Sequence, residues 1–64
     1  MKLKKLVPLF DSDFLISDMD DGVTYAVECG IGILDNKAIS KQLEKKIISV
    51  SSFYDQVLVK VKLQ

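Results

Sequence analysis

The first ten residues carry apolar side chains at helical spacing. Leu3, Leu6, Val7 and Phe10 occupy positions i, i+3, i+4 and i+7, which places all four on one stripe of a helix. Pro8 lacks an amide donor, but proline is tolerated in the first turn of a helix. The pattern therefore predicts a short first helix that ends before the polar segment that follows.

Alternating apolar and polar positions then form two segments separated by a turn. Residues 13–18 are the first predicted strand, and a second begins at Val23, with apolar residues at every other position as far as Cys29. The Asp21–Gly22 pair between them is typical of a tight hairpin turn. We predict a β-hairpin, followed by a bend at residues 30–32.

The second half of the chain repeats this order. Residues 36–46 predict a helix, because apolar side chains recur at four-residue steps while lysines occupy the other face. Asp35 or Asn36 can cap its first turn. A third strand begins at Ile48, and after a turn a fourth covers residues 57–63.

The order αββαββ predicts an α+β fold: a small single domain over residues 1–64, with an antiparallel sheet and helices on one face. A chain of 64 residues buries only about 60% of the surface that it exposes when unfolded. Scaffolds of this size usually need disulfides, a metal or a partner subunit. Cys29 is the only cysteine and histidine is absent, so we expect neither a disulfide nor a zinc site, and we expect a homo-oligomer.

Charge is distributed unevenly although the net charge is zero. Residues 1–10 carry three lysines, residues 11–35 carry seven acidic residues and no cation, and residues 36–64 carry six lysines and two acidic residues. Such asymmetry steers association with charged partners. Pro8 and the aspartates interrupt the apolar N-terminal stretch, and no segment is long enough to cross a membrane, so we expect a cytoplasmic protein.

The composition argues against catalysis. Histidine, the usual general base near neutral pH, is absent, and so is arginine, which clamps phosphates and carboxylates in a bidentate manner. A domain of this size also offers little room for a closed pocket. We predict a protein that is not an enzyme and that uses no cofactor or metal ion.

Two features are candidate contact surfaces for a protein partner. Asp18, Asp20 and Asp21 could form an acidic tip that engages a basic protein surface, or they could be a solvated turn. If they are the contact, their replacement by asparagine should weaken binding without lowering stability much. Phe53 and Tyr54, at a predicted turn, could anchor a protein interface or stack on a base, or they could be buried against the helices.

The order of elements resembles that of small accessory proteins encoded by phages and other mobile elements of low-GC Gram-positive bacteria. In these proteins a Leu-rich helix ending in Phe-Asp, here residues 3–11, precedes a hairpin with an Asp-Gly tip, and segments like residues 47–50 and 57–61 complete the domain. The resemblance implies a bacterial host cell and an inhibitor that acts on a host defence protein by protein–protein contact.

Two alternatives stay open: an oligomeric sponge that sequesters a nucleotide signalling molecule, and a structural or assembly subunit. Direct binding of nucleic acid is not expected, because the chain as a whole is not basic.

Overall fold

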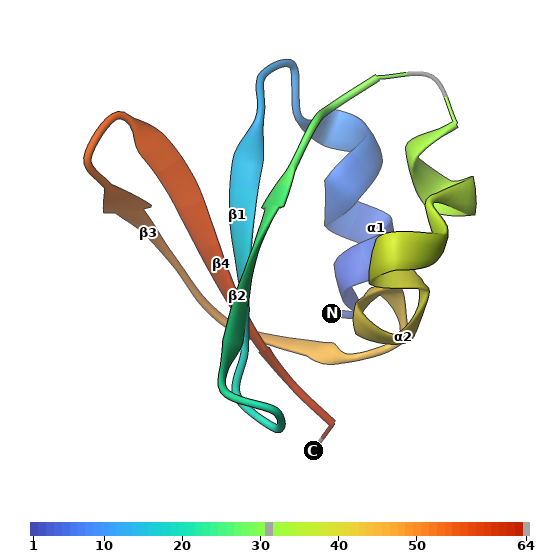
Figure 1. Cartoon of the computed structure of the whole chain (residues 1–64), viewed down its shortest axis with the longest axis vertical. Coiled ribbons are helices and arrows are strands. Elements are labelled where there is room, and N and C mark those ends of the chain that lie inside the picture. The colour runs from blue at the N-terminus through green and yellow to red at the C-terminus, as the bar shows by residue number, and fades with distance from the viewer. Residues whose placement is uncertain (31, 64) are drawn as a thin grey trace.

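The computed structural model describes residues 1–30 and 32–63, which form a four-stranded sheet with helical segments on one face (Figure 1). The α-helices and 3-10 helices (η) and the strands are, in chain order, α1 (Leu3–Leu6), η1 (Val7–Leu9), β1 (Phe14–Asp18), β2 (Val23–Val27), η2 (Ile33–Asp35), η3 (Lys37–Ile39), α2 (Ser40–Leu43), β3 (Lys46–Phe53) and β4 (Gln56–Lys62). The predicted α+β class is confirmed. The bend predicted at residues 30–32 includes Ile31, which lies outside the described residues.

The strand order is β2-β1-β4-β3, and the sheet is mixed. The β1–β2 and β3–β4 pairs are antiparallel hairpins, whereas β1 and β4 pair in parallel, so the prediction of a wholly antiparallel sheet is wrong at this junction. The reason is the path of the chain after β2. The chain runs through the helical layer and forms β3 at the far edge, and the second hairpin then returns β4 beside β1. In this central position, Val57, Val59 and Val61 of β4 contribute to the core.

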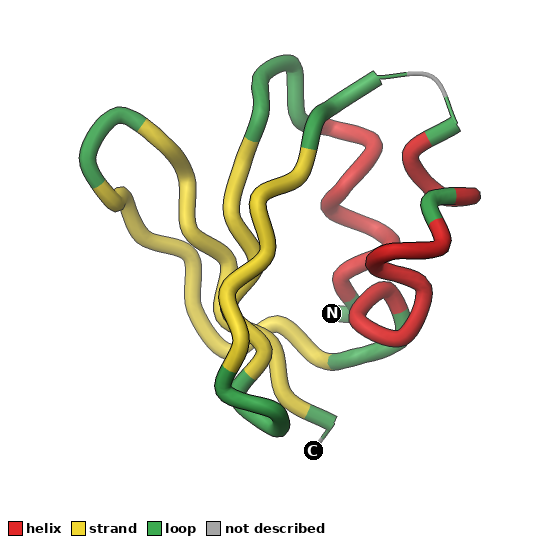
Figure 2. The backbone as a smooth tube through the Cα atoms, in the orientation of Figure 1, coloured by secondary structure: helices red, strands yellow, loops and turns green. Residues whose placement is uncertain are grey.

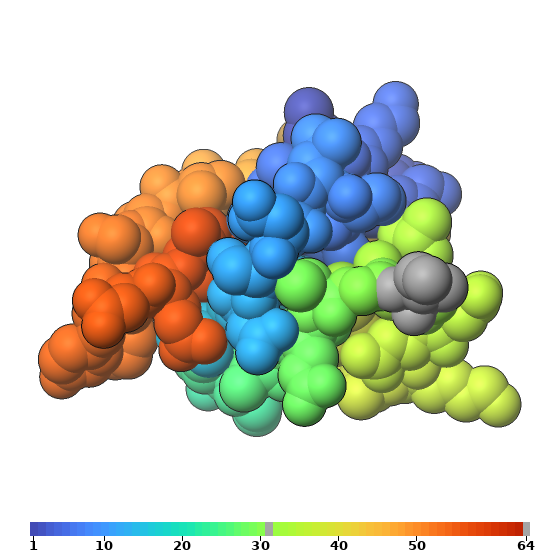
Figure 3. Space-filling view, turned by 90° about the horizontal axis from the view of Figure 1, so that it is seen from above, coloured from blue at the N-terminus to red at the C-terminus, as the bar shows by residue number. Residues whose placement is uncertain are grey.

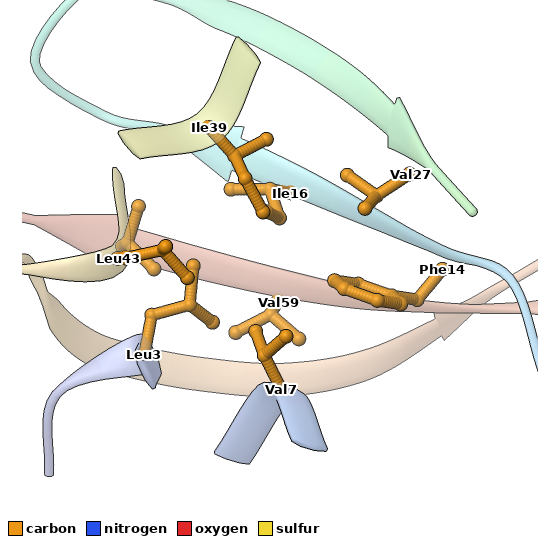
Figure 4. Packing of buried hydrophobic residues seen from close by; sticks show 9 residues of the cluster. Leu3, Val7, Phe14, Ile16, Val27, Ile39, Leu43 and Val59 are labelled. Atoms are coloured by element: carbon orange, nitrogen blue, oxygen red, sulfur yellow. The ribbon is translucent and has the colours of Figure 1, made fainter. Parts of the chain in front are cut away.

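The core lies between the helical layer and one face of the sheet, as Figure 4 shows. Residues in register on neighbouring strands share a face, so Phe14 and Ile16 of β1 lie beside Val57 and Val59 of β4. Phe10 stacks on Phe14 with ring centroids 4.3 Å apart. The buried hydrophobic residues are Leu3, Val7, Phe14, Ile16, Val27, Ile39, Leu43, Val59 and Val61. The apolar stripe of the predicted first helix therefore faces the core.

The second helix is shorter than the predicted span of residues 36–46. The Asn36 side chain caps η3, as expected, but α2 ends at Leu43. The carbonyl oxygen of Lys45 accepts a hydrogen bond of 2.9 Å from the backbone N–H of Leu3, and the next residue, Lys46, forms a bridge with Lys2. This pairing with the N-terminal segment explains why β3 begins two residues before the predicted start.

The β3–β4 hairpin projects beyond the helical layer (Figures 2 and 3). β3 is an edge strand, and a bulge at Ile48 shifts its register against β4. Ile48, Val50 and Phe53 are each about half exposed to solvent. None of the helices in the described part of the chain has the length and apolar character needed to span a membrane.

Candidate functional site

The acidic turn between β1 and β2 is tied into the fold by Asp18, whose relative exposure is 1%. Its Oδ2 atom lies 2.7 Å from Nζ of Lys45 and accepts a hydrogen bond of 2.8 Å from Nε2 of Gln42. Its Oδ1 atom accepts hydrogen bonds from the same lysine at 2.8 Å and from the backbone N–H of Asp20 at 2.9 Å. We call Asp18, Asp20, Gln42 and Lys45 the Asp18 cluster.

The electrostatics of the Asp18 cluster favour the ionised carboxylate. Burial raises the pKa of Asp18, but the hydrogen bonds from Lys45, Gln42 and the N–H of Asp20 outweigh burial and lower the pKa to about 2. The same contacts raise the pKa of Lys45, first through Asp18 and then through Asp20. At neutral pH the cluster is therefore a buried ion pair that locks the end of β1 to the segment between α2 and β3.

The expectation of a solvated tip formed by three aspartates is wrong for Asp18. The alternation of β1 could have shown this, because Asp18 follows Phe14 and Ile16 on the core-facing side of the strand. A carboxylate at such a position needs a cationic or hydrogen-bonding partner. The sequence did not identify Lys45 as that partner, since the two residues are 27 positions apart.

The other two predicted acidic residues are exposed or partly exposed, but their oxygens are also engaged within the chain. Oδ2 of Asp20 lies 2.9 Å from Nζ of Lys45 and accepts a hydrogen bond from the N–H of Leu63 at 2.8 Å. Asp21 accepts hydrogen bonds from the N–H of Val23 at 2.8 Å and from the hydroxyl of Tyr25 at 2.7 Å. Most carboxylate oxygens of the turn therefore already have hydrogen-bonding partners within the chain.

The predicted aromatic residues, in contrast, are free of the core. Phe53 and Tyr54 have relative exposures of 50% and 89%, so their burial against the helices is excluded. Their rings meet edge to face, with centroids 4.7 Å apart. Phe53 pairs with Gln56, which leaves a two-residue turn in which Tyr54 has a φ of 56°. We call Phe53 and Tyr54 the aromatic tip.

The structure does not bring the two candidate surfaces together. The aromatic tip lies next to the start of β4, and Val57 of β4 pairs with Phe14 at the start of β1. The acidic turn follows Asp18 at the other end of β1. The two surfaces therefore occupy opposite ends of the sheet (Figure 1).

The outer edge of β3 is a further candidate surface, which the sequence prediction missed. Within the described residues, its partner on that side is the short N-terminal segment, through a bridge from Lys2 to Lys46. The rest of the edge, residues 48–53, carries neither a charge nor a proline. Charges and prolines are the usual protection of edge strands against pairing with another chain. The uncharged run in the sequence was the available signal for this surface.

Within residues 1–30 and 32–63, no three His, Cys, Asp or Glu side chains gather in a way that could hold a metal ion. The chain matches no protein-family model, and no curated protein or solved structure is significantly similar to it.

Proposed function

We propose that the protein is a non-catalytic binding protein, that it acts by contact with another protein, and that the aromatic tip is its contact surface. The observation that carries this proposal is the conformation of Tyr54. It is the only non-glycine residue with a positive φ among the described residues, and it is also 89% exposed.

The conformation of Tyr54 is unfavourable for its residue type. A left-handed backbone costs a non-glycine residue about 1 kcal/mol or more, and glycine or asparagine is preferred in two-residue hairpin turns. An exposed tyrosine at this position buries little surface in return. Strained backbone conformations of this kind cluster at functional sites, and tyrosine is enriched among the residues that dominate binding energy at protein interfaces.

The partner that we propose is a host defence protein, which the chain inhibits by occupying part of its surface. The resemblance to accessory proteins of mobile elements supports this choice. The acidic turn is not part of the proposed surface, because the oxygens of Asp18, Asp20 and Asp21 already bind groups of the same chain.

We also propose that two copies of the chain pair through β3. The free edge at residues 48–53 is uncharged, so an antiparallel pair of identical strands places no like charges opposite each other. The pair would cover Ile48 and Val50, which are otherwise half exposed. It would also add buried surface to a chain whose own core is small.

The replacement Tyr54→Gly tests the contact surface. The variant removes the aromatic ring and relieves the backbone strain, so we expect an unchanged or higher free energy of unfolding together with loss of the partner. The matched control is Leu9→Ala, because Leu9 on η1 is also a large, mostly exposed side chain, with a relative exposure of 76%.

Immobilised wild-type protein and both variants would be incubated with lysate of the bacterial host, and captured proteins would be quantified by mass spectrometry. We expect wild type and Leu9→Ala to retain one host protein that Tyr54→Gly does not retain. If Tyr54→Gly retains every protein that wild type captures, the aromatic tip is not the contact surface.

A further inference from the structure

Four lysines from distant parts of the chain surround one hollow on the surface. The cavity has a volume of about 530 Å³, and Lys2, Lys4, Lys5 and Lys46 line it together with a single acidic residue, Glu44. These side chains give the lining a net charge of +3 at neutral pH, although the whole chain is neutral. We call this hollow the lysine cavity.

Two of these lysines already pair with the same side-chain carboxylate. Nζ of Lys2 lies 3.3 Å from Oε1 of Glu44, and Nζ of Lys4 lies 3.1 Å from Oε2 of the same carboxylate. Their hydrogen bonds, that of Lys4 first, hold the pKa of Glu44 below its ordinary value. The geometry shows that separate lysine side chains can converge on one carboxylate-sized group.

The backbone places further positive charge beside this pair. Lys46 is in register with Lys2 on one side and with Lys62 of β4 on the other. Residues in register share a face of the sheet, and like charges directly opposite each other are destabilising. An anion bound in the lysine cavity would relieve the repulsion between Lys2 and Lys46 and would therefore stabilise the folded protein.

The rim of the lysine cavity is apolar. Met1 and Leu63 line it, and both are largely exposed. Small-molecule sites typically have volumes of about 300–1,000 Å³ and combine apolar walls with a few charged groups. Lysine binds phosphate as a point charge, which suits a chain that has no arginine.

We propose that the lysine cavity binds a free nucleotide-like molecule, with its phosphates among the lysines and its base against the apolar rim. This site is independent of the aromatic tip. It goes beyond the proposed protein contact and adds a ligand that could control that contact or be sequestered by the chain.

Isothermal titration calorimetry with adenosine triphosphate, pyrophosphate and inorganic phosphate tests the proposal, with ionic strength held constant by sodium chloride. We expect the triphosphate to bind more tightly than pyrophosphate, and pyrophosphate more tightly than phosphate. Lys46→Gln should weaken binding about tenfold, which corresponds to one charge-assisted contact. Glu44→Gln should strengthen it, because it removes the competing carboxylate.

The matched control is Lys41→Gln, which removes the same charge from α2 outside the lysine cavity and should change the affinity less than about twofold because distant surface charges are screened. Circular dichroism would verify that each variant is folded, and Lys4→Gln replaces Lys46→Gln if that variant is not. Equal weakening by the cavity and control variants, or no binding of triphosphate and pyrophosphate, would overturn the proposal. Binding of a thymidine oligonucleotide more tightly than the triphosphate would also overturn it, because it would assign the lysines to nucleic acid.

Discussion

Replacement of Asp18 by asparagine is the sharpest test of how the fold is held together. The substitution keeps the size of the side chain and removes its charge. It leaves the ammonium group of Lys45, whose side chain is only 12% exposed, with Asp20 as its remaining carboxylate partner. We expect Asp18→Asn to be strongly destabilising.

Two estimates of the magnitude agree. The pKa of Asp18 falls from 3.8 to about 2, and this shift corresponds to roughly 2 kcal/mol of stability at neutral pH. Breaking a buried ion pair by removing one partner costs about 3–5 kcal/mol, and the remaining contact between Lys45 and Asp20 places this case at or below the lower end. We therefore expect a loss of about 2–3 kcal/mol, against a total of roughly 3–5 kcal/mol for a domain of this size.

Urea unfolding followed by far-UV circular dichroism measures this loss. With a slope of about 1 kcal/mol per M, the midpoint should fall by about 2–3 M. All samples must have the same protein concentration, because self-association would contribute to stability. The control is Asp55→Asn in the exposed β3–β4 turn, which should change stability by less than about 0.5 kcal/mol. If Asp18→Asn is as stable as this control, the Asp18 cluster does not stabilise the fold.

Two further outcomes are expected. The depressed pKa of Asp18 contributes stability that is fully present above its unfolded pKa of 3.8 and is lost as the pH falls towards about 2. Wild-type protein should therefore lose stability over this range, and Asp18→Asn should lose much less. Urea titrations at several pH values measure this, and equal acid sensitivity of the two proteins would contradict the reasoning. Wild-type protein should be a dimer, whereas Val50→Lys should be a folded monomer because it places a charge on the free edge of β3. Size-exclusion chromatography with light scattering measures both masses. An unchanged mass in the variant would exclude pairing through β3.

Local patterns in the sequence predicted most of the elements, because each depends on nearby residues. The first hairpin follows from alternation and from the Asp21–Gly22 turn, and its strands lie within a few residues of the predicted bounds. The parallel pairing of β1 with β4 depends on how the chain crosses the helical layer, which no local pattern specifies. The early end of α2 likewise depends on a backbone contact between Leu3 and Lys45, which are distant in sequence.

In the candidate sites, too, local patterns predicted some features, while others depend on the folded structure. The exposure of Phe53 and Tyr54 agrees with their predicted position at a turn, whereas the strain at Tyr54 is visible only in the backbone dihedral angle. The role of Asp18 was misjudged because its charge suggested solvent, while its place in the alternation of β1 indicated burial. The lysine cavity could not have been predicted, since its residues come together through long-range pairing of the N-terminal segment with residues 44–47.

The fold pairs several of the acidic residues internally and gathers lysines on one part of the surface. The acidic segment, residues 11–35, suggested a negative surface, but its hairpin aspartates are engaged by Lys45, by backbone N–H groups and by a tyrosine hydroxyl. The lysines at the start of the chain meet Lys46 around the lysine cavity, where Glu44 is the single acidic residue of the lining. Charge that is already paired within the fold contributes little to attracting a partner, because its field is largely cancelled at a distance. A local surplus of positive charge remains in the lining of the lysine cavity, so this part of an otherwise neutral protein should prefer an anionic ligand to a basic protein surface.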